Sequence, residues 1–457
     1  MKWKRGKEKS LGPVTKAATR TNDRIVFVHK FFVQNFGCRA TQADGAALES
    51  LLTGKGLAAA DNREAADLVV LNTCTVTAEA DSDVRSTVRR VHRENPGAKI
   101  LVTGCYAQRA PDELAAMDGV EWVVGNSHKT QIADIVTAAE YHGNIHIGDI
   151  FAQHDFLSAP VEDAAGDRAR PNLKIQDGCN NRCSFCIIPY VRGRSRSMPV
   201  EQVVQQVRSL SEAHREVVLS GINLGRWGRE PGIGMRIEDL VRLLLDETPV
   251  ERLRLSSVEP MDFSRVLLEL MAGSARIANH VHAPLQSGSD TVLRRMHRKY
   301  RPHHYASRVL LARELMPEAA IGADVMVGFP GESEAEFEES RAFLESLPIT
   351  YLHVFTYSER PGTPAAQAVG AVPVPVRKAR NKVLRDLAVR KNLAFRRSMV
   401  GRSLSVVTLG EGNMALSSNY LKVELARAYP ANVLLDVTVA GVTDANVRQA
   451  AELAVLR

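Results

Sequence analysis

From residue 25 to about residue 150, short apolar runs alternate with stretches whose apolar positions recur every three or four residues. The apolar runs predict strands, and the stretches between them predict helices that pack by one face. The expected strands are 25–33, 66–73, 98–104 and 120–125, and the expected helices are 42–54, 78–95 and 111–117. Because strands and helices alternate, residues 25–150 should form an α/β domain with a parallel sheet.

A second alternating region follows a polar segment, 151–171, which reads as a linker. Its six expected strands are 172–178, 216–222, 252–260, 280–288, 321–330 and 351–358, with helical stretches between them. Six strand–helix units predict an incomplete, TIM-like (βα)6 barrel over 172–397, and such barrels carry their active sites at the strand ends. The polar residues at these ends are Asn223, Ser256, Ser257, Glu259, Gln286, Ser287 and Asp324.

The two ends of the chain read differently from its middle. Residues 398–457 contain apolar runs at 404–412, 419–427 and 432–442 that look like short antiparallel strands. They predict a small β-barrel, which in enzymes often binds RNA, with a structural cap as the alternative. Residues 1–24 are basic and lack an apolar stretch, so we expect a disordered arm.

The composition fits a globular protein of several domains. The chain has 457 residues, of which 45% are hydrophobic and 24% charged. No apolar run approaches the ~18 residues of a membrane span, and no secretory signal is visible, so we expect a cytoplasmic protein without a membrane partner. The net charge is +7, and basic residues gather at 1–24, 192–196, 294–301 and 377–397, as phosphate-facing surfaces or as solvated helix faces.

Three of the six cysteines form the motif CxxxCxxC at Cys179, Cys183 and Cys186, just after the first expected barrel strand. A [4Fe–4S] cluster has one ligand site per iron, so three thiolates leave one iron open to a small molecule. A zinc site needs a fourth ligand, and the nearest histidines, His154 and His214, are distant in sequence. A disulfide framework suits small secreted domains. The motif therefore favours an iron–sulfur cluster.

The other three cysteines, Cys38, Cys74 and Cys105, each follow the C-terminal end of an expected strand. The C-terminal ends of parallel strands share one edge of a sheet, and ligands bind along that edge. Thiols that are far apart in the sequence should therefore converge there. This placement predicts a second three-thiolate cluster site.

These residues together resemble the radical S-adenosylmethionine methylthiotransferase family, over essentially the whole chain. The upstream cysteines lie in FGCR, NTCT and TGCY contexts, and further shared blocks are LSGINLG (219–225), SSVEP (256–260), PLQSGSD (284–290), GFPGE (328–332) and YSERPGT (357–363). The stretches NTCTVTAEAD (72–81) and TGCYAQ (103–108) most resemble the branch acting on threonylcarbamoyladenosine in tRNA. Two departures are Thr41, where the family usually has Asn, and a tail that follows the TRAM pattern loosely.

The resemblance implies an enzyme that inserts a methylthio group at carbon 2 of the threonylcarbamoyladenosine next to the anticodon. It implies two [4Fe–4S] clusters, one binding S-adenosylmethionine and one holding the sulfur to be transferred. The implied partners are tRNA, a flavodoxin- or ferredoxin-type electron donor, and a sulfur donor. Alternative substrates are isopentenyladenosine in tRNA and an aspartate of a ribosomal protein. A different class of function is a non-catalytic iron–sulfur protein that binds RNA or carries electrons.

Roles for single residues follow from the same resemblance. Phe185 is expected near the adenine of S-adenosylmethionine, or as a shield for the cluster. The candidates for contacts with the methionyl and ribose groups of S-adenosylmethionine are Gly221, Asn223, Ser257, Glu259 and Gln286. Each of these residues could instead cap a strand or helix. The cluster-loop arginines are expected to contact tRNA or a substrate carboxylate, unless the loop is merely solvated; they are Arg192, Arg194 and Arg196. The histidines in strand patterns are read as structural; they are His29, His280 and His282.

Overall fold

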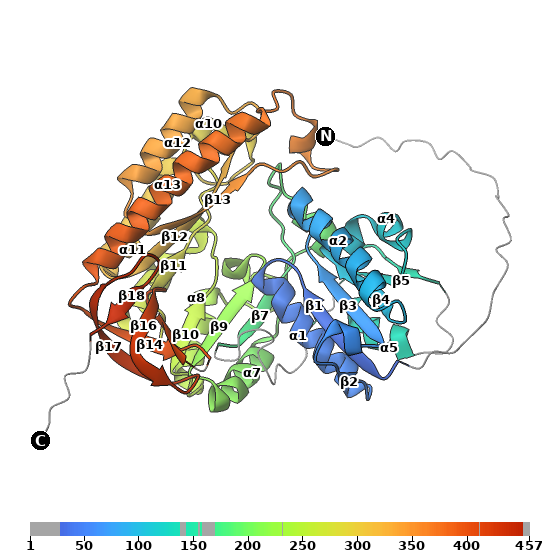
Figure 1. Ribbon diagram of the computed structural model, residues 1–457. Coiled ribbons are helices and arrows are strands. Elements are labelled where there is room, and N and C mark those ends of the chain that lie inside the picture. Colours follow the sequence, from blue (N-terminus) through green and yellow to red (C-terminus); the bar gives the residue numbers. More distant parts are fainter. Residues whose placement is uncertain are drawn as a thin grey trace, which may run out of the picture.

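The computed structural model describes residues 28–137, 143–153, 156–157, 170–230, 232–410 and 412–450. Three sheet-based units follow one another along this part of the chain, which is mixed α/β as predicted (Figure 1). The expected arm 1–24 and much of the expected linker 151–171 lie outside the described residues. Among the helices that the structure describes, none has the length and apolar character needed to cross a membrane.

The first unit is a six-stranded sheet in the order β2-β1-β3-β4-β5-β6, and all of its pairs are parallel. Its strands are β1 (Lys30–Asn35), β2 (Ala58–Ala59), β3 (Leu68–Thr73), β4 (Lys99–Gly104), β5 (Val120–Gly125) and β6 (Ile145–His146). Its helices are α1 (Arg39–Gly54), α2 (Ala78–Glu94), α3 (Cys105–Arg109), α4 (Pro111–Ala115) and α5 (Ile132–Thr137). The four expected strands are present. The edge strands β2 and β6 were missed, because two residues carry no periodicity.

Helices cover both faces of this sheet, and the alternation within β3 shows why. All six of its residues are buried. Val69 and Leu71 pack with Val84 and Val88 of α2 on one face. The intervening positions, exemplified by Val70, pack with residues of α1 and α5 on the other face. A strand buried on both sides reads as a continuous apolar run, as parallel sheets do.

The second unit contains all six expected strands as an open barrel in chain order. They are β7 (Asn172–Asp177), β9 (Glu216–Gly221), β10 (Arg252–Leu255), β11 (His280–His282), β12 (Ala320–Val327) and β13 (Tyr351–Thr356), with the short β8 (Arg196–Ser197) antiparallel to β7. The sheets β10-β9-β7-β8 and β11-β12-β13 meet through a parallel bridge between Leu253 and Ile277. The helices are α6 (Ile188–Arg192), α7 (Val200–Ala213), α8 (Ile237–Glu247), α9 (Arg265–Gly273), α10 (Asp290–Arg295), α11 (Pro302–Leu315), α12 (Glu334–Ser346) and α13 (Val374–Ser398).

The N-terminal unit covers the open side of this barrel. Helix α1 lies beside β7, where the Asn172 side chain donates to the Arg39 carbonyl at 2.7 Å (Figure 1). At the other margin, the backbone N–H of Ala78 donates to Ser358 Oγ, just after β13, at 3.0 Å. The N-terminal unit therefore bridges from the first barrel strand to beyond the last one.

The third unit is a closed five-stranded barrel in the order β14-β15-β16-β18-β17. Its strands are β14 (Ser403–Thr408), β15 (Gly412–Ser417), β16 (Lys422–Tyr429), β17 (Leu434–Val442) and β18 (Val447–Gln449). The expected runs correspond to β14, β16 and β17, whereas β15 and β18 were missed. The pairs β14–β15, β14–β17, β15–β16 and β17–β18 are antiparallel, and the short β18 pairs in parallel with β16 to close the barrel.

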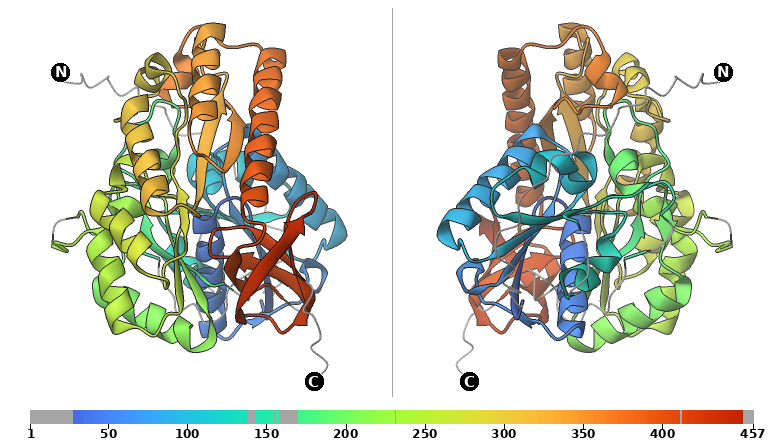
Figure 2. Two further views of the ribbon diagram at one scale, coloured as in Figure 1. Left: turned by 90° about the vertical axis from the view of Figure 1, so that its left-hand side faces the viewer. Right: turned by 90° about the vertical axis from the view of Figure 1, so that its right-hand side faces the viewer.

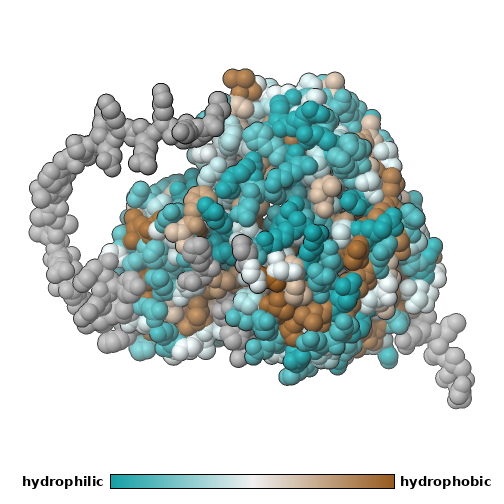
Figure 3. All heavy atoms as spheres, turned by 180° about the vertical axis from the view of Figure 1, so that it is seen from behind, coloured by the Kyte–Doolittle hydropathy of each residue, from teal (hydrophilic) through white to brown (hydrophobic). Residues whose placement is uncertain are grey.

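The closed barrel seals the N-terminal ends of the (βα)6 strands. Arg252, at the start of β10, donates to Ser405 Oγ at 2.6 Å, and the N–H of Asn279, before β11, donates to Ser418 Oγ at 2.9 Å. Helix α13 lies beside α12, packs against β13 and ends at the closed barrel (Figure 2). Hydrophilic residues cover most of the rear face of the molecule, and hydrophobic ones form small groups there (Figure 3). The CxxxCxxC loop lies at the opposite, C-terminal end of the strands.

Candidate functional site

The structure brings Cys38, Cys74 and Cys105 together at one edge of the N-terminal sheet. Cys38 precedes α1, Cys74 directly follows β3, and Cys105 begins α3 directly after β4. Because β1, β3 and β4 are adjacent parallel strands, these three positions share an edge. Burial raises the pKa of Cys74 to about 12, and the neighbouring Cys105 and Cys38 thiols add to the effect. We call these residues the auxiliary triad.

Two glycines allow the chain to pass close to this triad. Gly37 has φ +99°, and a Cβ there would lie 2.5 Å from the Cβ of Cys74. Gly104 has φ +98°, and a Cβ there would lie 2.4 Å from the Thr73 carbonyl oxygen. Any side chain would therefore be both strained and obstructed. The buried Thr41, where the family usually has Asn, places its Oγ1 3.6 Å from Cys38 Sγ.

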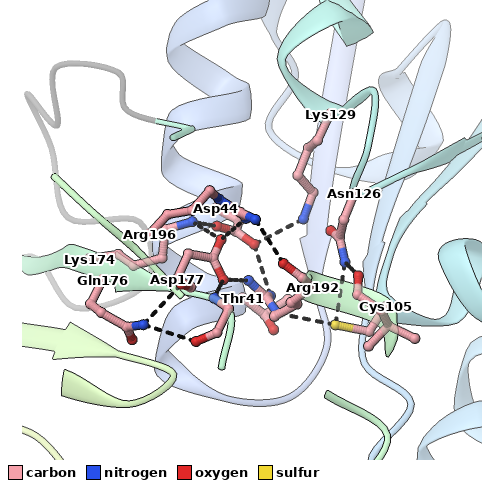
Figure 4. Close-up of polar contacts among 12 residues, drawn as sticks. Thr41, Asp44, Cys105, Asn126, Lys129, Lys174, Gln176, Asp177, Arg192 and Arg196 are labelled. Atoms are coloured by element: carbon pink, nitrogen blue, oxygen red, sulfur yellow. Dashed lines mark hydrogen bonds and ion pairs between the residues drawn. The ribbon is translucent and has the colours of Figure 1, made fainter. Parts of the chain in front are cut away.

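Cys105 receives hydrogen bonds from outside its own loop. Arg192 donates from Nε to Cys105 Sγ at 3.2 Å, and the Asn126 side chain donates to the same sulfur at 3.7 Å (Figure 4). The remaining nitrogens of Arg192 donate to Asp177 and Asp44, each at 2.9 Å. Arg192 follows the CxxxCxxC loop, so this residue of the barrel contacts a thiol of the N-terminal unit directly.

The carboxylates that hold Arg192 belong to a buried ionic network between the two units. Asp44, on α1, accepts from Lys129 at 2.9 Å and also from Lys174 on β7. Burial alone would raise the pKa of Asp44, but Lys129, Lys174 and Arg192 together hold it well below its usual value. Cations outnumber carboxylates here, which suits a neighbouring anionic thiolate site.

Cys179, Cys183 and Cys186 come together within the loop between β7 and α6. The N–H of Cys186 donates to the Cys183 carbonyl at 3.1 Å, which turns the loop. The N–H of Cys179 donates to the Gly193 carbonyl at 3.1 Å, which closes the loop at its base. Burial raises the pKa of Cys186 to about 12, and Cys183 and Cys179 add to it. We call these residues the radical triad.

Hydrogen-bond donors also surround the radical triad. Arg298 donates to Cys183 Sγ at 3.3 Å and to Glu259 at 2.5 Å. The Asn223 side chain donates to Cys179 Sγ at 3.6 Å. Arg298 was read only as part of the basic cluster 294–301, and the structure buries it at 7% exposure. The sequence carried no signal for this contact, since an inward-facing arginine in a basic run looks like its solvated neighbours.

The other predicted cofactor residues lie at the same end of the barrel. Gly221 ends β9, where a Cβ would lie 2.9 Å from the Cβ of Gln176. Ser257 shares a 2.6 Å hydrogen bond with His282 Nδ1. Gln286 has φ +70° and pairs with β12 through a bridge to Val325. Phe185 packs against a small core that includes Met296 and Phe329, a placement suited to shielding.

The three cluster-loop arginines differ in exposure. Arg192 is 2% exposed and fully engaged, so the expectation that it contacts tRNA or a substrate carboxylate does not fit its burial. Arg196 is half-buried and lies 3.7 Å from Asp177. Arg194 is exposed. Of the three, Arg194 alone presents its side chain to solvent.

A cavity of about 230 Å³ occupies the barrel interior. Its lining includes Cys38 of the auxiliary triad and, at the closed end, Tyr420 of the C-terminal barrel. Tyr420 stacks on His280 with ring centroids 4.3 Å apart. Sequence reasoning missed this pocket and read its histidines as structural, because the inward direction of β11 side chains depends on strand register. The missed lining residues are Arg39, Arg254, Tyr351, His353 and Tyr420.

Both triads fit a [4Fe–4S] cluster with one open iron. All six cysteines are free thiols, and each triad gathers three of them beside hydrogen-bond donors. Soft thiolates are the ligands that iron–sulfur clusters prefer, and hydrogen bonds to the sulfurs tune them. The donor set thus matches the cofactors that the sequence implied.

Comparison with known proteins agrees with this geometry. Residues 173–344 match the model of the Radical SAM superfamily, and residues 30–125 match that of the uncharacterized protein family UPF0004. A solved radical S-adenosylmethionine methyltransferase, TsrM from Kitasatospora setae, superposes with a TM-score of 0.55 at 15% identity, over 74% of this chain and 76% of that chain. That likeness shows a shared fold.

Curated relatives extend the match to most of the chain. The threonylcarbamoyladenosine tRNA methylthiotransferase MtaB of Aquifex aeolicus is 36% identical over 400 residues, which cover 86% of this chain and 96% of the relative. The tRNA-2-methylthio-N(6)-dimethylallyladenosine synthase of Desulfitobacterium hafniense is 31% identical over 386 residues, which cover 82% and 85%. With two three-cysteine sites on this fold, the chain belongs to the family of radical S-adenosylmethionine tRNA methylthiotransferases.

Proposed function

We propose that the protein transfers a methylthio group to carbon 2 of threonylcarbamoyladenosine in tRNA. The observation that carries the proposal is a cavity that begins at Cys38 of the auxiliary triad and reaches Gly221 and Ser257, at the C-terminal ends of β9 and β10, the end of the barrel that also carries the radical triad. A base held at the mouth of this cavity would lie between the sheet edge that carries the auxiliary triad and the strand ends that carry the radical triad. The similarity to MtaB, at 36% identity, supports this substrate over the isopentenyladenosine alternative at 31%.

The two triads would hold two [4Fe–4S] clusters. When bound, these groups supply the one-electron cleavage of S-adenosylmethionine and the sulfur for transfer. The protein's own residues fix the thiolates: Arg192 and Asn126 donate to Cys105, while Arg298 and Asn223 donate to the radical triad. Such donors stabilise the charge on coordinating sulfurs.

Asn223 supports the placement of S-adenosylmethionine. Its side chain is buried, its Nδ2 donates to Cys179 Sγ, and its Oδ1 accepts no hydrogen bond from the described residues. A buried acceptor without a partner is costly, so a ligand N–H is the natural donor for it. The amino group of S-adenosylmethionine fits this position. Gly221, Ser257, Glu259, Gln286 and Phe185 remain the other candidates for cofactor contacts.

The tRNA body would bind outside the barrel. A surface groove of about 300 Å³ is lined by Lys378, Arg385 and the exposed ring of Phe355, which suit phosphates and a stacked base. Arg194 is a further exposed contact for the tRNA body.

The proposal keeps the predicted units, 25–150 for the auxiliary cluster, 172–397 for radical chemistry and 398–457 for RNA. It also keeps a flavodoxin- or ferredoxin-type electron donor, a sulfur donor and a cytoplasmic location.

The test offers the reconstituted enzyme two anticodon stem-loop RNAs, one with threonylcarbamoyladenosine and one with isopentenyladenosine. Product is measured by mass spectrometry of the nucleosides. We expect a methylthio product only from the first RNA. Product from the isopentenyladenosine RNA alone would contradict the substrate assignment. Absence of product from both RNAs, with S-adenosylmethionine still cleaved, would point to the ribosomal-protein branch.

A further inference from the structure

The size of the barrel cavity limits what it can hold. One wall is formed by Cys38 and Arg39 of the N-terminal unit, and another by Gly221 and Ser257 at the strand ends. Its volume of about 230 Å³ is below the ~300–1,000 Å³ of pockets that bury a drug-sized ligand. The cavity therefore suits a substituent of a base better than a whole nucleotide.

The cavity wall contains a chain of polar side chains centred on Asp324. Asp324 Oδ1 lies 3.0 Å from His353 Nδ1 and 3.2 Å from His282 Nε2, and His282 in turn contacts Ser257. Burial alone would raise the pKa of Asp324, but the adjacent His282 and His353 side chains hold it well below its usual value. The carboxyl is therefore ionised, and its charge is already engaged by donors in the wall. Asp324 is the single carboxylate among the described residues that line the cavity.

Arg39 is the cation of this wall that has no internal partner. Arg254, the other arginine, binds Glu216 through two hydrogen bonds of 2.7 and 3.0 Å. In the part of the chain that the structure describes, no carboxylate pairs with the Arg39 guanidinium. Its charge reaches the cavity interior: burial is the main cause of the low pKa of His280, and Arg39 is among the positive groups that add to it. A free guanidinium beside a cavity is a binding group for an anion.

The two alternative substrates differ in the chemistry of the substituent on the adenine. A threonylcarbamoyl group carries a carboxylate, a hydroxyl and a urea, whereas an isopentenyl group carries none of these. A guanidinium binds a carboxylate through two parallel hydrogen bonds. A wall of polar groups rejects an apolar analogue, because its own polar atoms would be left unpaired.

We propose that this cavity is the specificity site for the substituent on the adenine, with Arg39 binding its carboxylate. His353, which Asp324 holds through Nδ1, binds the hydroxyl or urea through Nε2. The inference rests on the proposed function and names the residues that select the substrate. Because Arg39 is adjacent to Cys38, the bound carboxylate would anchor the base beside the auxiliary triad.

The test measures binding to the reconstituted holoenzyme by fluorescence anisotropy. Three anticodon stem-loop RNAs differ only at the target base: threonylcarbamoyladenosine, its methyl ester, and isopentenyladenosine. The wild-type protein should bind the acid about 10- to 100-fold more tightly than the ester, as expected for a charge-assisted hydrogen-bonded pair. Arg39→Gln should remove most of this difference by weakening the acid alone. His353→Phe should weaken the acid and the ester alike.

Matched variants separate this role from general charge and from folding. Arg90, on α2 of the same unit, is exposed, so Arg90→Gln makes the same change in net charge away from the cavity. It should affect the acid and the ester equally. Arg39→Lys keeps the charge but loses the planar fork, and should bind the acid with intermediate affinity. Iron content per chain shows whether each variant has folded and loaded its clusters.

Several results would overturn the inference. Equal affinity of the wild-type protein for the acid and the ester excludes recognition of the carboxylate without using any variant. If Arg39→Gln weakens binding of the acid and the ester RNAs equally, Arg39 has a general electrostatic role instead. The proposed function fails separately: wild-type protein that modifies only the isopentenyladenosine RNA contradicts it, and the inference then falls with it. If the wild-type protein modifies the threonylcarbamoyladenosine RNA and Arg39→Gln leaves its acid–ester difference intact, only the inference fails.

Discussion

The auxiliary and radical triads accept hydrogen bonds from the same two types of side chain, but they are assembled in different ways. Each has one arginine and one asparagine that donate to sulfur, at 3.2 and 3.7 Å in the auxiliary triad and at 3.3 and 3.6 Å in the radical triad. The radical triad lies within one loop, 179–186. The auxiliary triad comes from three loops after three adjacent strands. A site built in one loop depends on local turns, whereas one built from three loops depends on the whole sheet.

The two arginines also differ in what holds them. Arg298 is fixed within the barrel by Glu259 and by the ring of Tyr300, 4.9 Å from its centre. Arg192 is fixed by Asp44 and Asp177, which belong to different units. The auxiliary site is therefore completed by docking of the barrel, and the radical site is not. The two sites should consequently respond differently to mutation.

The largest expected difference comes from removing each triad. Replacing Cys179, Cys183 and Cys186 with Ala should abolish cleavage of S-adenosylmethionine, because the radical site would then hold no cluster to deliver the electron. Replacing Cys38, Cys74 and Cys105 with Ala should preserve cleavage and stop methylthio transfer. Cleavage is measured as 5′-deoxyadenosine formed under anaerobic conditions, and transfer as methylthio nucleoside.

Iron content provides the control for both triple variants. The wild-type protein should bind about eight irons per chain, and each variant about four. About four irons in the wild-type protein would contradict the assignment of two cluster sites, because only one triad would then hold a cluster. Loss of cleavage in the auxiliary variant with four irons retained would show that the radical site also needs the other cluster.

The next largest effect is expected from the ionic network that joins the two units. Asp44→Asn leaves the buried Lys129, Lys174 and Arg192 with too few carboxylates, and should cost about 3–5 kcal/mol of unfolding free energy. Stability is measured by urea unfolding at pH 7. The network lowers the pKa of Asp44, so its contribution is present above the unfolded value of about 3.9 and is lost as the pH falls through the folded value. Asp44→Asn should therefore lack the part of the unfolding free energy that the wild-type protein loses as the pH falls.

A surface pair provides the control for Asp44. Lys382 and Asp386 lie one turn apart on α13 and are both largely exposed. Asp386→Asn should change the unfolding free energy by less than about 0.5 kcal/mol, since exposed pairs contribute little. A similarly small cost for Asp44→Asn would mean that the network does not hold the two units together.

The same contrast explains what the sequence could predict. Cys179, Cys183 and Cys186 are recognisable from spacing alone, because their loop is local. The convergence of Cys38, Cys74 and Cys105 required only that each follow a parallel strand, so it too could be inferred. Partners across units could not be inferred, because pairing Arg192 with Asp44 depends on how α1 docks against β7. For this reason Arg192 looked like a surface residue in the sequence.

The cavity was missed for a related reason. Asp324 was visible as a polar residue on an expected strand, but its contacts with His282 and His353 depend on strand register. A shift of one residue would turn each of these side chains to the other face of its strand. The role of Tyr420 was even harder to predict from the sequence, since this residue reaches the cavity from the C-terminal barrel. Local patterns therefore gave the elements, and only the packing of three units gave the pocket.

A smaller effect is expected from the glycine that precedes the auxiliary triad. Gly37→Ala places a methyl group against Cys74 at φ +99°, and should cost about 1–2 kcal/mol for the backbone alone. It should lower iron incorporation at the auxiliary site and preserve cleavage of S-adenosylmethionine. Gly401 provides a control, because it has φ +82° but nothing within 4 Å of its Cβ position. If Gly401→Ala lowers iron content equally, backbone strain rather than contact with Cys74 is responsible.

The smallest expected effect sharpens the comparison between the two arginines. Arg192→Gln removes the charged donor to Cys105, which should make the auxiliary cluster harder to reduce, because hydrogen bonds to sulfur stabilise the reduced, more negative state. A loss of about 1.4 kcal/mol corresponds to ~59 mV for one electron. The potential is measured by redox titration monitored by electron paramagnetic resonance, in a protein with the radical triad replaced by Ala. Arg298→Gln in that background should leave the auxiliary potential unchanged, because Arg298 contacts Cys183 of the radical triad in the wild-type protein and no sulfur of the auxiliary triad. If both substitutions lower the potential equally, the effect comes from net charge, and the direct contact between Arg192 and Cys105 does not set the potential.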